Sequence, residues 1–232
     1  MNSKKEAVVF LASGGLDSTV GMAKAIEELD VVVYPLYIER GAQADAMERR
    51  SLGNVYDELK RRYPENLMPV CFERYLCPPP SWKQTYCRED VLRLGYPMRD
   101  IVLQSVGVQY AEYLNALAPA YVGHLPNVEE LSIRQVMVGQ TSDEVLPHAT
   151  EYALRFASYY VQIDRDDESW AICSPLLFPE LMTKADVVRW GDRHEIPMEL
   201  TWSCFRPGPT PCHVCQGCEL REQAFAAVEG RW

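Results

Sequence analysis

The sequence predicts an α/β fold built on a parallel sheet, and two stretches near its start carry that prediction. The first is a short apolar run over residues 7–12 that breaks into a pair of glycines and continues as a helix. The second is a near-continuous apolar run over residues 31–38, the pattern of a parallel strand buried on both faces. The two apolar strands are connected by the helix and not by a hairpin turn. The connection is therefore expected to be a right-handed crossover.

The other elements are predicted from periodicity, turn residues and helix caps. We expect helices over residues 18–28, 43–62, 101–117, 151–160 and 183–194, and further strands over residues 67–72, 120–123 and 171–176. The strand over residues 120–123 would end at His124 and place it on the edge of the sheet where ligands bind. Thr183 and Asp186 have the spacing of a capping box. Residues 125–150 show no clear periodicity.

Length, charge and hydropathy limit the class of protein. The 232 residues suffice for one α/β domain, expected over residues 1–200, and a small C-terminal segment over residues 201–232. A net charge of −10 argues against a nucleic-acid partner, because such partners require Lys/Arg-rich faces. No apolar run approaches the roughly 20 residues of a membrane span, and the first strand begins too early for a signal peptide. We therefore expect a cytoplasmic protein without membrane contact.

The loop after the first strand is interpreted as a nucleotide-phosphate site. It consists of Ser13, Gly14, Gly15, Leu16, Asp17, Ser18 and Thr19. Adjacent glycines let the backbone take φ > 0 and approach an anion without a Cβ in the way, and the N-terminus of the following helix adds partial positive charge. The loop lacks the Gly-Lys-Ser/Thr ending of a Walker A motif. The alternative is an ordinary strand-to-helix turn.

Two cations further along the chain are candidates for binding phosphate. Arg99 stands immediately before an expected helix, where it would lie beside free N–H groups. Lys184 lies in the first turn of the helix that the capping box begins. The alternatives are a surface arginine and an exposed helical lysine. Between the third strand and Arg99, residues 77–98 form a long aperiodic stretch with three consecutive prolines and several aromatic residues, which favours a lid or a partner-binding arm.

Four of the eight cysteines gather near the C-terminus at spacings suited to a metal. They are Cys204, Cys212, Cys215 and Cys218, and they include two Cys-x-x-Cys steps. Four thiolates at these spacings can close a tetrahedral zinc site, which would hold the proline-rich loop between the first two cysteines. His213 is a competing ligand, and a redox centre or an iron–sulfur cluster is a further alternative.

The phosphate loop resembles the Ser-Gly-Gly-x-Asp-Ser signature of the ATP pyrophosphatases, and most of the chain resembles the 7-cyano-7-deazaguanine synthases, the QueC-like family. The stretches that carry the resemblance are residues 13–19, 96–100, 174–177, 183–186 and 199–204 followed by the other cysteines. The resemblance implies a Rossmann-like sheet of the adenine nucleotide alpha hydrolase-like type, with helices on both faces and a zinc-binding C-terminal segment. It leaves a homodimer open.

The resemblance also implies a reaction. Family members use ATP and Mg2+ to adenylate the carboxylate of 7-carboxy-7-deazaguanine. Ammonia then displaces AMP to give an amide, and a second adenylation leads to the nitrile. In this reading Asp17 orients the metal or the loop, Arg99 and Lys184 stabilise the departing pyrophosphate, and the zinc is structural.

Two departures from the family put the acceptor in question. Residues 39–45 replace a Gly-Gln-x-His stretch, and residues 145–150 replace a Tyr-Pro-Asp-Cys-Arg-Pro segment where the family holds its deazaguanine. The acceptor is then ammonia or a protein amine, because relatives in antiphage defence are linked to joining a deazaguanine to a protein. The alternative function is a nucleotide-binding or regulatory protein that has lost turnover.

Overall fold

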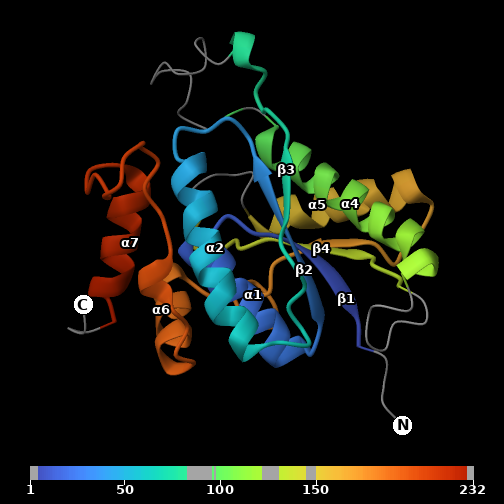
Figure 1. Ribbon diagram of the computed structural model, residues 1–232, viewed down its shortest axis with the longest axis horizontal. Helices are drawn as coiled ribbons and strands as arrows, with labels where there is room; N and C mark the ends of the chain where they lie inside the picture. Colours follow the sequence, from blue (N-terminus) through green and yellow to red (C-terminus); the bar gives the residue numbers. More distant parts are fainter. Residues whose placement is uncertain (1–4, 83–95, 97, 122–130, 145–149, 229–232) are drawn as a thin grey trace.

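A computed structural model describes residues 5–82, 96, 98–121, 131–144 and 150–228 and contains a five-stranded parallel sheet (Figure 1). The strands are β1 (Ala7–Leu11), β2 (Val32–Glu39), β3 (Cys71–Arg74), β4 (Gln135–Met137) and β5 (Ala171–Cys173). Their order is β3-β2-β1-β4-β5, and every neighbouring pair is parallel. The order reverses between β1 and β4, and in such sheets ligands bind beside this point at the carboxyl ends of the strands. The predicted Rossmann-like α/β fold is confirmed.

Helices cover both faces of the sheet (Figure 1). They are α1 (Leu16–Leu29), α2 (Asp45–Arg62), α4 (Arg99–Tyr121), α5 (Glu151–Arg165), α6 (Lys184–Arg193) and α7 (Gln216–Ala226), with a short 3-10 helix, η3 (Met198–Leu200). Side chains on β1 alternate between two hydrophobic clusters. Val8 and Phe10 pack with α1, α2 and α6, whereas Val9 packs with α4 and α5. The core is therefore divided by the sheet, as successive strand residues point to opposite faces.

The strand predicted over residues 120–123 was wrong. Helix α4 continues to Tyr121. The strand that pairs with β1 on the side away from β2 is β4, which lies within the stretch that showed no periodicity. Three residues are too few to reveal a strand pattern, although β4 lies between two other strands. Residues 122–130, including His124, lie outside the described part of the chain.

Other boundaries also moved. Helix α5 extends to Arg165, because Val161 continues the buried face formed by Leu154 and Ala157. Strand β3 begins at Cys71 rather than residue 67. Pro69, which has no N–H to donate, separates it from an isolated bridge between Leu67 and Val33. Most of the predicted arm, residues 83–95 and 97, lies outside the described residues.

The capping box of α6 is confirmed. The Asp186 N–H donates to Thr183 Oγ1 at 3.2 Å, and the Thr183 N–H donates to Asp186 Oδ2 at 2.9 Å. The box fixes the start of α6, and so the position of Lys184 as its first residue.

Candidate nucleotide site and metal centre

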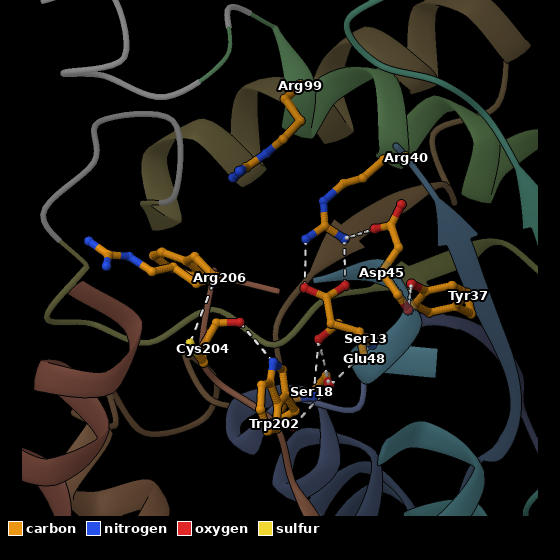
Figure 2. A network of polar contacts seen from close by, with 12 residues as sticks. Ser13, Ser18, Tyr37, Arg40, Asp45, Glu48, Arg99, Trp202, Cys204 and Arg206 are labelled. Atoms are coloured by element: carbon orange, nitrogen blue, oxygen red, sulfur yellow. Dashed lines mark hydrogen bonds and ion pairs between the residues drawn. The ribbon is translucent and has the colours of Figure 1, made fainter. Parts of the chain in front are cut away.

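The loop after β1 curls around the start of α1 through its own serines (Figure 2). The Ser13 N–H donates to Ser18 Oγ at 3.3 Å, the two hydroxyl oxygens lie 3.1 Å apart, and the Ser18 hydroxyl donates to the Gly15 carbonyl at 3.1 Å. The N-cap of α1 is Gly15, which has no side chain to occupy the first N–H groups of the helix. The start of α1 therefore offers N–H donors and partial positive charge to an anion.

The two loop glycines differ in what they do. Gly14 has φ +70°, and a Cβ there would lie 2.5 Å from the Leu52 nitrogen and 2.7 Å from the Glu48 oxygen. Gly15 has φ −80°, a value open to any residue. Gly14 thus has the positive φ expected of the loop, and it is also required because the backbone of α2 packs against it; the role of both glycines in ligand approach stays a prediction.

Asp17 and Lys184 meet at the switch point of the sheet. Lys184 Nζ lies 2.5 Å from Asp17 Oδ2, and the two side chains are 17% and 19% exposed. Asp143 accepts the Lys184 backbone N–H at 3.1 Å. Burial alone would lower the pKa of Lys184, but the carboxylates of Asp17, Glu144 and Asp143 raise it above its usual value. The lysine is thus held as a cation beside the uncapped start of α1.

Arg99 is not brought into this pair. It is the first residue of α4 rather than the residue before the helix, and its Nε donates to Asp100 Oδ1 at 2.7 Å. Its side chain is 30% exposed. Asp100 nevertheless acts on the same region, because its charge helps raise the pKa of Glu144, which burial raises most.

A buried charge group at the end of β2 was missed by the sequence analysis. Arg40 donates to both carboxylate oxygens of Glu48, each at 2.8 Å, and approaches Asp45 Oδ1 at 3.9 Å (Figure 2). Glu48 is only 10% exposed because it shares the inner face of α2 with Leu52 and Val55. That spacing of three and four residues was a readable signal.

Buried oxygen atoms without partners gather around the start of α1. Within the described ranges, four side-chain oxygens that lack a hydrogen-bond partner belong to α1 and to the stretch after β4: Asp17 Oδ1, Thr19 Oγ1, Gln140 Oε1 and Thr141 Oγ1. These two segments touch, since a Cβ on Gly139 would lie 2.6 Å from the Ser18 nitrogen. Buried polar atoms without partners are rare and call for a ligand, an ion or water.

The four C-terminal cysteines converge into one cluster that can hold a metal ion. The sulfurs of Cys204, Cys212, Cys215 and Cys218 all lie within 4.8 Å of one another. Cys215 Sγ lies 3.9 Å from Cys204 Sγ and 3.6 Å from Cys218 Sγ. A tetrahedron with Zn–S distances near 2.3 Å has edges of about 3.8 Å, so these separations suit a four-thiolate site.

Backbone N–H groups donate to the cysteine sulfurs, whereas the neighbouring histidine contacts a glutamate. The N–H groups of Arg206 and Cys212 point at Cys204 Sγ, each at 3.4 Å. A hydrogen bond from the Val214 backbone is the main reason that the pKa of Cys212 is lowered to about 6. Both effects favour thiolate at Cys204 and Cys212, whereas burial raises the pKa of Cys218. His213 Nδ1 instead lies 2.7 Å from Glu222 Oε1, and its side chain is 68% exposed.

Comparisons with known proteins agree with the resemblance. Residues 126–229 match the family model described as queuosine biosynthesis protein QueC. The 7-cyano-7-deazaguanine synthase of Methanothrix thermoacetophila is 25% identical over 94% of this chain and 92% of its own length. That of Nautilia profundicola is 26% identical over 98% and 97%. The chain is QueC-like. The alignments with these two synthases span nearly the whole QueC-like chain, whereas the family model matches residues 126–229 alone.

A solved structure was also matched. The U34-tRNA thiolase NcsA from Methanococcus maripaludis, with its [4Fe-4S] cluster, is 13% identical, with a TM-score of 0.40 and coverage of 98% of this chain and 72% of that chain. A structural similarity with so low a TM-score does not identify the metal of the four-cysteine cluster. Among the residues that the structure describes, no helix has the length and apolar character of a membrane span.

Proposed function

We propose that this QueC-like protein is an ATP-dependent ligase that adenylates the carboxylate of 7-carboxy-7-deazaguanine. The main support is the Lys184–Asp17 pair, which lies 2.5 Å apart at the uncapped start of α1. An anion there would meet helix N–H groups and a lysine that its carboxylate neighbours keep charged. The relatives named as synthases of this type supply the substrate class.

The proposed chemistry divides among these residues. A carboxylate oxygen of the acid attacks the α-phosphorus of ATP, the bond from that phosphorus to the bridging oxygen breaks, and pyrophosphate leaves with the electron pair. The N–H groups at the start of α1 and the Lys184 ammonium stabilise the charge on the departing pyrophosphate. Arg99 is a second cation for this role. The acyl-adenylate then has AMP as its leaving group.

Mg2+ fits the oxygens that lack partners. Asp17 Oδ2 accepts a hydrogen bond from Lys184, whereas Asp17 Oδ1 is buried without a partner in the described part of the chain. Carboxylate oxygens are ligands that Mg2+ prefers, and the ion usually binds through one or two of them together with phosphates. Mg2+ would reduce the charge of the triphosphate. Asp17 is thus our candidate to orient the metal and the loop together.

For the cysteine cluster we propose structural zinc. A site closed by four thiolates leaves no open position for water or substrate, so it supports folding rather than chemistry. The N–H donors aimed at the sulfurs suit a metal-bound thiolate set. In this proposal His213 is not a ligand.

The acceptor of the acyl group is either ammonia or a protein amine. The segment 145–150 contains neither the cysteine nor the arginine of the family pattern. Only Thr150 of this segment is described, and it caps α5 by accepting the Ala153 N–H at 3.3 Å. We therefore propose that the second activation is weak. With ammonium as acceptor, mass spectrometry should find adenylate or amide, and rapid conversion to nitrile would contradict this proposal.

A pyrophosphate assay tests the proposed function against a regulatory protein without turnover. The full chain is incubated with ATP and Mg2+, with and without 7-carboxy-7-deazaguanine. We expect pyrophosphate release that depends on the acid. Tight ATP binding without acid-dependent release would instead favour the regulatory alternative. The control is Arg189→Ala, which removes an exposed ion pair with Asp186 on α6, the helix that begins with Lys184. This variant should release pyrophosphate like the parent.

A further inference from the structure

Ser51, on the inner face of α2, connects two segments that are far apart in the sequence. Its Oγ lies 2.7 Å from the Gly14 carbonyl oxygen and 2.7 Å from the Leu200 carbonyl oxygen. The serine is only 6% exposed, so water does not compete freely for these contacts. The single hydroxyl proton of Ser51 is therefore shared between a carbonyl of the phosphate loop and a carbonyl of the segment that leads into the cysteine cluster.

The second connection comes from Trp202. Its backbone N–H donates to the Gly14 carbonyl at 2.9 Å, and its indole Nε1 donates to the Cys204 carbonyl at 2.8 Å. Figure 2 shows Trp202 between the loop serines and Cys204. The Gly14 carbonyl thus accepts from two donors, one on α2 and one two residues before a cysteine of the cluster.

The segment over residues 198–204, which we call the strap, is also held from the metal side. Arg221 of α7, three residues after Cys218, donates to Thr201 Oγ1 at 2.6 Å and to the Met198 carbonyl at 2.8 Å. The start of α7 lies directly against the strap, because a Cβ on Gly217 would be 2.0 Å from the Ser203 oxygen. Movement of α7 would therefore move the strap.

From these contacts we infer that Ser51 is a positioning residue that couples the four-cysteine centre to the phosphate loop. The inference rests on the proposed function of that loop. The orientation of the Gly14 carbonyl fixes the peptide plane that carries the Gly15 N–H at the start of α1. If metal binding holds the strap in the orientation that binds nucleotide, nucleotide binding must tighten metal binding by the same factor. Nucleotide and metal thus reinforce one another through Ser51.

The test compares Ser51→Ala with a matched serine. Ser158 Oγ on α5 also lies within 2.9 Å of two carbonyl oxygens, those of Leu154 and Ile172, but α5 packs on the face of the sheet opposite to α2. Ser51→Ala should weaken MgATP binding by roughly tenfold, the change that one hydrogen bond commonly supplies. It should also speed zinc release to a chelator, and MgATP should slow that release less than in the parent. Ser158→Ala should lower the melting temperature without either effect. Ser51→Thr, which keeps the hydroxyl, should restore nucleotide binding.

Two results would overturn the inference. One is a folded Ser51→Ala protein that binds MgATP as tightly as the parent. The other is a Ser51→Ala protein that releases zinc at the parental rate and whose zinc release is slowed by MgATP as much as in the parent. Either can occur while the parent still releases pyrophosphate with the acid substrate, so the inference fails separately from the proposed function. A parent that does not bind MgATP would contradict the proposed function, and the rate of zinc release alone would then decide whether Ser51 supports the cysteine segment.

Discussion

Lys184 Nζ lies 2.5 Å from Asp17 Oδ2 and joins the first turn of α6 to the first turn of α1. The residues are 167 positions apart in the chain, and each follows a strand of the parallel sheet. Each side chain is less than one-fifth exposed. A largely buried carboxylate that loses its cation is strongly disfavoured, so this contact contributes both to the fold and to the charge of the site.

Lys184→Ala should separate these two contributions. We expect acid-dependent pyrophosphate release to fall by roughly 100-fold or more, as when one charge-stabilising donor is removed from a site. The free energy of unfolding should fall by about 3 kcal/mol or less, because 17% and 19% of the two side chains still contact water. Arg189→Ala on the same helix is the control. A Lys184→Ala enzyme with parental turnover would mean that the pair is structural only.

Glu144 should make the stability depend on pH. Burial is the main cause that raises its pKa above the ordinary 4.5, Lys184 opposes that rise, and Asp17, Asp143 and Asp100 add to it. The folded state therefore holds this proton more tightly than the unfolded state. Stability from the protonated group is present below about pH 4.5 and is lost as the pH rises through the raised pKa.

Glu144→Gln keeps the side chain neutral and should remove that loss. We expect the variant to exceed the parent in urea-unfolding midpoint at pH 8 and to match it near pH 4. The exposed Glu180→Gln is the control and should leave the pH profile unchanged. A Glu144→Gln protein that is less stable than the parent at pH 8 would contradict the assignment.

The two loop glycines should respond differently to alanine. Gly14→Ala places a side chain at φ +70° and within 2.7 Å of the α2 backbone, so it should destabilise the fold by more than the roughly 1–2 kcal/mol of the left-handed conformation alone. Gly15→Ala meets Ser13 Oγ at 3.2 Å and the Trp202 oxygen at 3.3 Å. It should fold and lose mainly nucleotide affinity. Urea unfolding and MgATP titration distinguish the two, and equal stability for both variants would refute the difference.

Replacing one cysteine of the cluster should expose the role of the metal. Cys215→Ser should lower the zinc content per chain and the melting temperature, by roughly 10 °C for a loss of about 3 kcal/mol. Cys71→Ser, at a thiol outside the cluster, should retain full metal. Metal analysis of the parent that found iron, or a Cys215→Ser protein that melts like the parent, would count against structural zinc.

Local patterns predicted much of this molecule. The apolar runs of β1 and β2, the capping box of α6 and the spacing of the cysteines each depend on residues close together in the chain. Their positions in the structure agree with those patterns. The cysteine cluster could be predicted for the same reason, because its four members fall within a short segment.

Contacts between distant segments could not be predicted in this way. Strand β4 is recognisable by its pairing with β1 and β5, because three residues carry no usable periodicity. The need for Gly14 depends on where α2 packs, and the Arg40–Glu48 pair depends on the same helix. Ser51, between the loop and the strap, is likewise an ordinary helical serine until the fold brings its partners together.

The most direct test of the proposed chemistry is to follow the carboxylate oxygen of the acid. The substrate 7-carboxy-7-deazaguanine is labelled with heavy oxygen in its carboxylate and incubated with ATP, Mg2+ and an amine acceptor. Adenylation transfers one labelled oxygen to the α-phosphorus, so mass spectrometry should find the label in AMP, with pyrophosphate unlabelled. Unlabelled AMP, or label in inorganic phosphate with ADP as the other product, would contradict carboxylate adenylation.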